Sequence, residues 1–324
     1  MLGGSMFIGR RIVERLHERG DEVLVAHRGR TEPRDWVPVQ HLHVARTDLE
    51  QYAAEIDAFA PEAVVDSYAL TASDVHAVRD LLTGLPAVVL SSQDVYEAYS
   101  ALTSGRGGVP VPYAEDAELR TERYPYRGKG FPDVPEDYEK LDVERLWLER
   151  GATVLRLARV YGPHDDQRRE EFMLRRIRAG RVRIPVGPAT LRWSKVHVDD
   201  VATAVLLALD TGSAAGQPVN IAESEAVPMR DWMRQIAAGA GAEVEFVQVP
   251  DAALPADLAL TGAIAQDMYA AVDRARDLLG WSVSDPEQRV HDSVWWHLHH
   301  PPQSSWTEAE TDADEAALAQ ASAD

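Results

Sequence analysis

A glycine-rich turn that runs directly into an amphipathic helix begins the chain. The turn spans Gly3 to Gly9, and apolar residues then recur at helical spacing up to Gly20. The strand-like run 22–26 follows. A sharp bend at Gly3 leaves room for the phosphates of a dinucleotide, and Gly9 lets the helix lie close to a sheet. This order of turn, helix and strand predicts a dinucleotide-binding unit. The expected cofactor contacts are Gly3, Ser5, Met6, Phe7, Ile8 and Gly9.

The strand that should precede this turn is almost missing. Only Met1 and Leu2 stand before Gly3, whereas a strand of about five apolar residues is usual there. Two interpretations follow: a recorded start downstream of the true one, which we favour, or a sheet with a gap in its centre.

Apolar strand-like runs alternate with helical patterns through the first half of the chain. This alternation is typical of a parallel sheet with crossover helices, so we expect an α/β fold built on a doubly wound parallel sheet. The expected strands after the first helix are 22–26, 42–44, 63–65, 87–90 and 153–155. Beyond about residue 162 the pattern is less regular, which predicts a smaller α/β substrate domain at the carboxyl edge of the sheet.

The expected domain division follows from these patterns. Residues 1–161 and about 194–222 form the nucleotide-binding domain, and about 162–193 and 223–300 form the substrate domain. The segment 301–324 is acidic and poor in apolar residues, so it is expected to be a disordered tail.

Charge and composition narrow the classes of partner. The chain has 324 residues, no cysteine and a formal net charge of −20. Such a charge argues against nucleic acid and anionic membranes as partners, because both need clustered positive charge. The absence of a membrane-length apolar run or a signal-peptide pattern predicts a cytoplasmic protein.

Four stretches, taken in order, resemble the extended short-chain dehydrogenase/reductase family, the group of NAD-dependent epimerases and dehydratases. They are 3–9, 91–96, 156–163 and 196–202. The resemblance implies a Rossmann-type fold, hydride transfer through a nicotinamide cofactor and, for many members, a nucleotide-sugar substrate. Met6 departs from the family pattern, because a glycine usually stands there.

The loop after the strand expected at 22–26 bears on the choice between NAD and NADP. NAD-preferring sites usually place an acid there, whereas this chain has Arg28 and Arg30. Two guanidinium groups suit a ribose 2′-phosphate, so NADP is slightly favoured, with solvated loop charges as the alternative. Asp48 matches the family position that contacts adenine, and it is equally suited to capping a helix that begins near residue 49.

The catalytic pattern of the family is incomplete. The resemblance makes Ser92 the residue that orients the substrate oxygen, and Ser91 is expected to cap the strand end. The family then needs Tyr-x-x-x-Lys on a helix, but here the nearest pair is Tyr138 and Lys140, two residues apart. Residues two apart on a regular helix point to nearly opposite sides. Both reach one site only if Tyr138 lies in an irregular first turn.

Three interpretations of this pair stay open. In the first, Tyr138 is the acid/base and Lys140 or an arginine assists. In the second, Lys140 binds the cofactor ribose while Glu136 or water moves the proton. In the third, catalysis has been lost. Tyr124, Tyr126 and Lys129 are weaker candidates in a stretch rich in glycine and proline. That stretch is expected to be a loop that covers the substrate.

Substrate contacts are expected from basic residues near two of the family motifs. Arg159 and Arg192 suit a phosphate or carboxylate, with ion pairing to nearby acids as the alternative. Asp199 is expected to cap the helix after it. No metal site is predicted, because the histidines between 291 and 300 favour capping and packing.

The sequence also raises two functions other than catalysis and one assembly state. The first alternative is a non-catalytic NAD(P)-binding sensor or regulatory protein. RNA binding, known for family members with this variant of the glycine turn, is disfavoured by the acidic charge. A homodimer is possible by analogy with the family.

Overall fold

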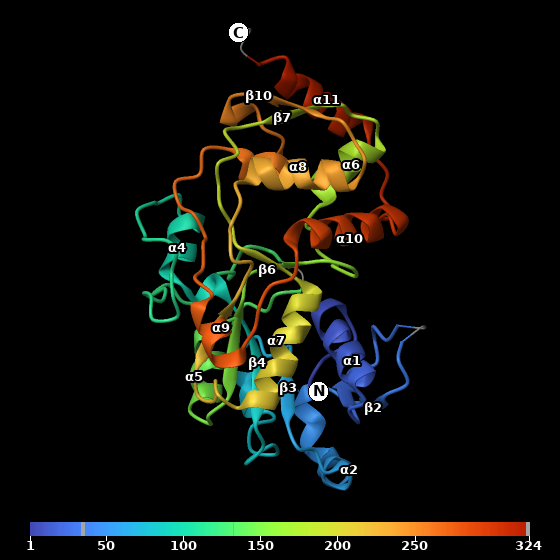
Figure 1. The fold of residues 1–324 in the computed structure, drawn as a ribbon, viewed down its shortest axis with the longest axis vertical. Helices are drawn as coiled ribbons and strands as arrows, with labels where there is room; N and C mark the ends of the chain where they lie inside the picture. Colours follow the sequence, from blue (N-terminus) through green and yellow to red (C-terminus); the bar gives the residue numbers. More distant parts are fainter. Residues whose placement is uncertain (34–35, 132, 322–324) are drawn as a thin grey trace.

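A parallel β-sheet flanked by helices forms one half of the molecule (Figure 1). The computed structural model describes residues 1–33, 36–131 and 133–321. The strands of this sheet are β1 (Leu24–His27), β2 (Gln40–His43), β3 (Val64–Asp66), β4 (Ala87–Ser92), β5 (Thr153–Leu157) and β9 (Pro218–Ile221). Their parallel pairing confirms the expected doubly wound α/β class.

Leu2 occupies the place of the central strand between β1 and β3. It forms parallel bridges with Ala26 and Asp66. The amide of Leu2 donates to the carbonyl of Val65 at 2.8 Å, and the amide of Gly3 donates to that of Ala26 at 3.0 Å. The sheet therefore runs in the order β2, β1, Leu2, β3, β4, β5, β9, and the alternative of a sheet with a central gap is wrong. The short segment Met1 to Gly3 thus supplies both neighbouring strands with backbone partners.

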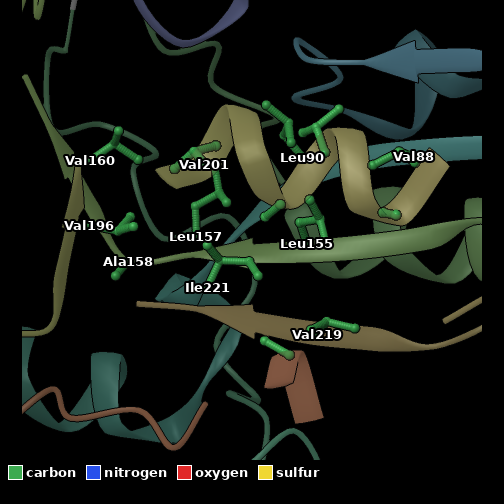
Figure 2. Packing of buried hydrophobic residues seen from close by; sticks show 14 of the residues in the cluster. Val88, Leu90, Leu155, Leu157, Ala158, Val160, Val196, Val201, Val219 and Ile221 are labelled. Atoms are coloured by element: carbon green, nitrogen blue, oxygen red, sulfur yellow. The ribbon is translucent and has the colours of Figure 1, made fainter. Parts of the chain in front are cut away.

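Helices cover both faces of this sheet. Helices α1 (Phe7–Arg19) and α7 (Val198–Thr211) pack together against one face, and α3 (Ala72–His76) and α5 (Lys140–Leu148) against the other. Alternate strand residues point to opposite faces, so Val88, Leu90 and Leu155 join one buried cluster while Val89 and Val154 join another. Figure 2 shows the first cluster, in which strand residues pack beside Val201 of α7. The remaining helices of this half are α2 (Ala53–Phe59), α4 (Glu97–Thr103) and α9 (Asp273–Leu279).

The second half gathers above the carboxyl ends of the strands (Figure 1). Its strands are β6 (Arg159–Tyr161) paired with β8 (Lys195–His197), and β7 (Arg183–Val186) paired with β10 (Glu245–Gln248). Its helices are α6 (Glu171–Arg178), α8 (Met229–Gly239), α10 (Pro286–His299) and α11 (Glu308–Leu318). A separate buried cluster, which includes Met173, Ile184 and Met233, forms its core. The boundaries of the two domains expected above remain predictions.

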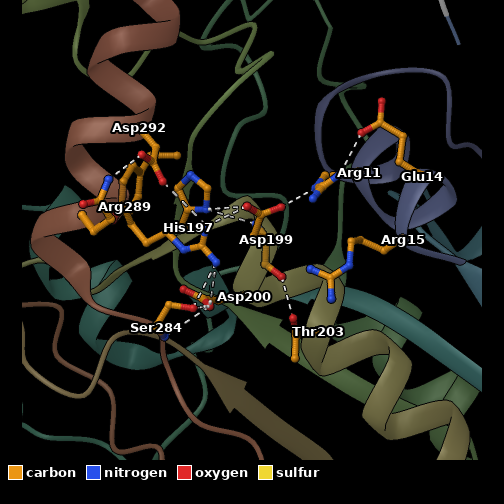
Figure 3. Close-up of polar contacts among 12 residues, drawn as sticks. Arg11, Glu14, Arg15, His197, Asp199, Asp200, Thr203, Ser284, Arg289 and Asp292 are labelled. Atoms are coloured by element: carbon orange, nitrogen blue, oxygen red, sulfur yellow. Dashed lines mark hydrogen bonds and ion pairs between the residues drawn. The ribbon is translucent and has the colours of Figure 1, made fainter. Parts of the chain in front are cut away.

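A polar network ties the two halves together (Figure 3). Asp199 of α7 pairs with Arg11 of α1 and, at 2.8 Å, with Arg289 of α10. The N-cap of α7 is His197, whose ring accepts from the amide of Asp199 at 3.2 Å. The expectation that Asp199 caps this helix is therefore wrong, because two arginines from distant elements occupy its carboxylate.

The acidic tail also differs from expectation. Within it, Glu308–Leu318 form α11, in which Asp314 is fully buried, and residues 322–324 lie outside the described residues. Both carboxylate oxygens of Asp314 accept from Arg176 of α6, at 2.7 and 2.9 Å, and Leu318 packs inward. Disorder was expected from composition, but a buried ion pair with a distant helix anchors the segment.

The histidines near the end of α10 bind backbone carbonyls. The ring of His297 meets the carbonyl of Gly162 at 3.1 Å, and the rings of His299 and His300 meet those of Trp295 and Trp296. These contacts agree with packing and capping. In the three described ranges, no helix combines the length and apolarity needed to cross a membrane.

Candidate active site

The glycine turn before α1 has the shape that an anion needs. Gly3 and Gly4 have φ of +77° and +125°, which favour glycine. A Cβ on Gly9 would lie 2.6 Å from the Cα of Gly4, so glycine lets α1 begin this close to the turn. Among the described residues, no side chain caps the start of α1 after Met6, and its first turn has no acid. The amides and positive end of the helix therefore suit the pyrophosphate of a dinucleotide.

The loop after β1 lies next to this turn. The hydroxyls of Ser5 and Thr31 are 2.7 Å apart, so the loop and the turn are in contact. Arg28 and Arg30 in this loop are exposed. Their guanidinium groups are thus accessible to a ligand that lies on the glycine turn.

Asp48 lies beyond β2, in the first turn of a 3-10 helix, Arg46–Tyr52, and it is exposed. The N-cap of this helix is Ala45, and no side chain of the described residues caps it. The capping alternative for Asp48 is therefore wrong. The adenine contact remains a prediction.

The two serines at the end of β4 have different partners. The Ser92 hydroxyl accepts from the amide of Asp94 at 3.2 Å, so Ser92 makes the cap that was expected of Ser91. The buried Ser91 donates to Glu144 at 2.6 Å, and Glu144 pairs with Arg156. Ser91 thus hydrogen-bonds to a buried ion pair, while Ser92 is half-buried at the carboxyl edge of the sheet.

The register conflict between Tyr138 and Lys140 is resolved by where the helix begins. Helix α5 starts at Lys140, and Tyr138 lies in the turn before it, with its amide bonded to the carbonyl of Pro135 at 3.0 Å. The buried Lys140 ammonium donates to the carbonyls of Ala69 and Leu90 at 2.6 and 3.0 Å. The condition stated from the sequence, an irregular first turn, is met, and both side chains influence one carboxylate.

That carboxylate belongs to Asp94, which the sequence analysis did not select. The hydroxyls of Tyr138 and Tyr126 donate to the same Asp94 oxygen, Oδ2, at 2.7 and 3.1 Å, and Tyr99 donates to Tyr126 at 3.0 Å. The other oxygen, Oδ1, is buried without a hydrogen-bond partner among the described residues. The sequence feature that could have identified Asp94 is its position in the strand-end motif 91–96, where a buried acid is unusual.

The electrostatics of this cluster differ from those of a Tyr-Lys dyad. Burial raises the pKa of Asp94, although the bond from Tyr138 and the charges of Arg120 and Lys140 oppose this. Burial and then the Asp94 charge raise the pKa of Tyr138 well above its usual range. Burial lowers the pKa of Lys140. Tyr138 therefore holds its proton firmly while Asp94 is ionised.

Glu136 has a different location from the cluster around Asp94. It is exposed, and its carboxylate accepts from the amide of Gly128 at 2.8 Å. Nothing in these contacts supports Glu136 as the group that moves the proton. Tyr126, a weaker candidate from the sequence, does enter the cluster, and its ring centroid lies 4.9 Å from that of Tyr138. The segment that carries Tyr126 thus covers Tyr138.

A cavity beyond the end of β5 contains Arg159. The guanidinium carbon lies 4.5 Å from the centroid of the Trp193 ring and 6.0 Å from that of Trp232. Burial and then the charge of Arg169 lower the pKa of Arg159 to about 9. An adjoining cavity of about 320 Å³ shares Arg159, Arg169 and Trp232. Concentrated positive charge beside aromatic rings suits a phosphate or carboxylate.

Arg192 does not join this site. It is exposed, and it is not among the described residues that line the two cavities. Arg168 and Arg175, which the sequence analysis did not select, line the larger one.

Comparison with known proteins finds similarity to an enzyme family, to a reductase and to a stem-loop binding protein. Residues 142–222 match the model of the NAD dependent epimerase/dehydratase family. A chloroplast stem-loop binding protein of 41 kDa from Arabidopsis thaliana is 26% identical over 87% of this chain and 74% of its own length. The 2′-dehydrokanamycin reductase of Streptomyces kanamyceticus is 25% identical over 76% of this chain and 68% of its own length.

A solved structure shares the fold over nearly the whole chain. It is a UDP-glucose 4-epimerase from Stenotrophomonas maltophila with bound NAD and formylated UDP-arabinopyranose. The TM-score is 0.69 at 18% identity, covering 92% of this chain and 97% of that one.

Proposed function

We propose, from the premise that this chain belongs to the NAD-dependent epimerase/dehydratase family of extended short-chain dehydrogenases, that it reduces a carbonyl group on an anionic substrate. One observation carries the proposal: the Tyr138 hydroxyl donates a hydrogen bond to Asp94. Asp94 follows Ser92 by two residues, and the charge of Lys140 acts on it. The preferred cofactor is NADPH, and the substrate class is a nucleotide sugar.

The cofactor fits the residues that are present. The turn from Gly3 to Gly9 would hold the pyrophosphate, and Arg28 and Arg30 would bind a 2′-phosphate. Once bound, the reduced nicotinamide supplies a hydride to the substrate carbon.

The state of Asp94 determines how Tyr138 supplies the proton. When Asp94 is ionised, it holds the Tyr138 proton in a 2.7 Å bond. When Asp94 is protonated, which its raised pKa favours, it donates to the Tyr138 oxygen and frees the phenol proton. Tyr138 then transfers that proton to the substrate oxygen as the carbonyl becomes an alcohol, and its oxygen takes the Asp94 proton. Because the pKa of Tyr138 is raised, Tyr138 keeps its proton at neutral pH and starts the step in the protonated form that reduction needs.

Substrate binding is attributed to the arginine-rich cavities. Arg159 lies just beyond β5, whose residue Leu157 is directly paired with Ser92 in β4. A substrate anchored by a phosphate at Arg159 thus lies at the same edge of the sheet as Ser92 and Asp94. Movement of the segment that carries Tyr126 would uncover Tyr138 for the substrate oxygen.

The test measures NADPH oxidation with 4-keto nucleotide sugars as substrates. We expect Tyr138→Phe to lower kcat by about a hundredfold or more while leaving the Kd for NADPH unchanged. Tyr124→Phe, in the same covering segment, is the matched control and should retain activity.

Two outcomes would contradict the proposal. The first is tight NADPH binding with no turnover of any keto substrate, which would favour a non-catalytic sensor. The second is turnover that Tyr138→Phe leaves unchanged. If NADP⁺ is instead recycled while a nucleotide sugar is epimerised, the reductase assignment is wrong although the family is right.

A further inference from the structure

Three imidazoles and one carboxylate converge at the carboxyl ends of β1 and β2. They belong to His27, Glu32, His41 and His43, which we name the three-histidine cluster. In the parallel pair, His27 lies directly opposite His43, and His41 precedes His43 by two residues on the same strand. Side chains two apart on a strand share a face, and paired residues on neighbouring parallel strands share it too. Strand pairing alone therefore brings three imidazoles close together, and the loop between the strands contributes Glu32.

The donor atoms in this cluster are close together. One ligand atom from each residue lies within 4.8 Å of all the others. The His27 Nε2 and His41 Nδ1 atoms are 2.9 Å apart, and the His43 Nε2 and Glu32 Oε2 atoms are also 2.9 Å apart. Four donors bound tetrahedrally at about 2.0–2.1 Å from a zinc ion would be about 3.3 Å apart. Two of the separations are shorter than that value, and the 3.7 Å between His41 Nε2 and Glu32 Oε1 is longer, so small side-chain rotations suffice to enclose an ion.

We propose that the three-histidine cluster is a binding site for a divalent transition metal, with Zn²⁺ as the ion that its donors suit best. Three imidazole nitrogens and one carboxylate oxygen supply a full tetrahedral set. Mg²⁺ and Ca²⁺ are disfavoured because they prefer oxygen ligands. The site is independent of the proposed reduction, since none of its members is assigned to proton transfer or substrate binding.

The surroundings of the cluster are those of a built site rather than of scattered surface histidines. His27 is buried, and the Trp36 ring centroid lies 5.1 Å from that of His41 and 6.2 Å from that of His27. An aromatic wall of this kind limits water on one side of the donors. His43 is more than half exposed, with 55% of its side chain accessible, which leaves an entry path for the ion.

Metal binding would also constrain the neighbouring loop. Arg28 and Arg30 lie between His27 and Glu32 in the sequence, so ligation of both fixes the two ends of this short segment. The metal would act there as a structural clamp, and the hydride transfer would not require it.

The test is a titration of the full chain, purified without a polyhistidine tag and dialysed against a chelator. ZnCl₂ is added in competition with a chromophoric chelator, and MgCl₂ is added in a parallel series. We expect one equivalent of Zn²⁺ to bind with micromolar or tighter affinity, no response to Mg²⁺, and a rise in Tm of several degrees with Zn²⁺. His43→Ala should weaken Zn²⁺ binding at least tenfold, because it removes one of four ligands.

Controls separate loss of the site from loss of the fold. His43 is largely exposed, so His43→Ala should keep the Tm of the metal-free protein. His291→Ala removes another exposed histidine, on α10, and should leave the zinc affinity unchanged. The proposal is overturned if Zn²⁺ does not bind at the stated affinity, or if His43→Ala and His291→Ala bind it alike. Either result can be obtained whether or not the protein reduces a nucleotide sugar.

Discussion

The hydroxyl of Tyr138 donates a 2.7 Å hydrogen bond to Asp94, a buried carboxylate two residues beyond Ser92. The negative charge of Asp94 raises the pKa of Tyr138, whereas the lysine of a Tyr-x-x-x-Lys pair lowers it. The proton affinity of the candidate acid is therefore set by an acid in the strand-end turn, and Lys140 influences it through Asp94.

Asp94→Asn should make Tyr138 easier to ionise. Removing the carboxylate charge takes away one of the two main causes of the raised pKa, so the Tyr138 pKa should fall. In the alcohol-oxidation direction Tyr138 must first lose its proton, so the rise of kcat with pH should occur at lower pH. Glu136→Gln, which alters an exposed acid nearby, should leave the profile in place. An Asp94→Asn profile identical to that of the wild type would show that Asp94 does not control Tyr138.

The double variant Arg28→Ala/Arg30→Ala should lose preference for NADPH. A guanidinium group that binds a 2′-phosphate contributes a charge-assisted hydrogen bond, so the Kd for NADPH should rise about tenfold or more. The Kd for NADH, which lacks that phosphate, should change little. Arg276→Ala, an exposed arginine on α9, serves as the control, and nicotinamide fluorescence reports both constants. Equal weakening for the two cofactors would contradict a 2′-phosphate contact.

Asp314→Ala should destabilise the docking of α11. Asp314 is fully buried, and its loss leaves the buried Arg176 with Asp257 as its one carboxylate partner among the described residues. We expect a loss of about 3 kcal/mol in the free energy of unfolding, measured by urea denaturation. The neighbouring exposed Asp312→Ala should change it by less than about 0.5 kcal/mol. If both variants behave alike, α11 is not anchored by this pair.

Glu170→Gln should stabilise the protein at alkaline pH relative to wild type. Burial raises the pKa of Glu170 to about 7 in the folded state, against an ordinary value of 4.5. For an acid with a raised folded pKa, stability falls as pH rises from 4.5 to 7, because the unfolded state releases the proton first. The variant lacks this penalty, so its advantage should grow between pH 5 and pH 8 to on the order of 3 kcal/mol.

A urea series at several pH values checks this expectation. Glutamine retains an acceptor for the Ser293 hydroxyl, which donates to Glu170 at 2.6 Å. Glu171→Gln, the adjacent and less buried acid, is the control. An advantage that does not vary with pH would contradict the raised pKa of Glu170.

The class of fold was predictable because its signals are local. The glycine turn, the helix that follows it and the alternation of strands with helices each depend on residues within about one element length. The motif order gave the resemblance to extended short-chain dehydrogenases, and the same short-range patterns placed Ser92 at a strand end. The sequence also indicates that Tyr138 and Lys140 can reach one site only if Tyr138 lies in an irregular turn. Such a turn before a helix is a local property.

Other features were decided only when distant parts of the chain met. Asp94 and Tyr138 are 44 residues apart, and Arg176 and Asp314 are 138 apart. The three-histidine cluster depends on which strand lies beside β1 and in which register, and a shift of one residue would turn His41 and His43 to the other face. Sequence alone thus determined the framework and the chemical types available to it. The tertiary structure decided which buried charges became partners, because burial and long-range pairing, unlike local propensity, arise only once the chain has folded.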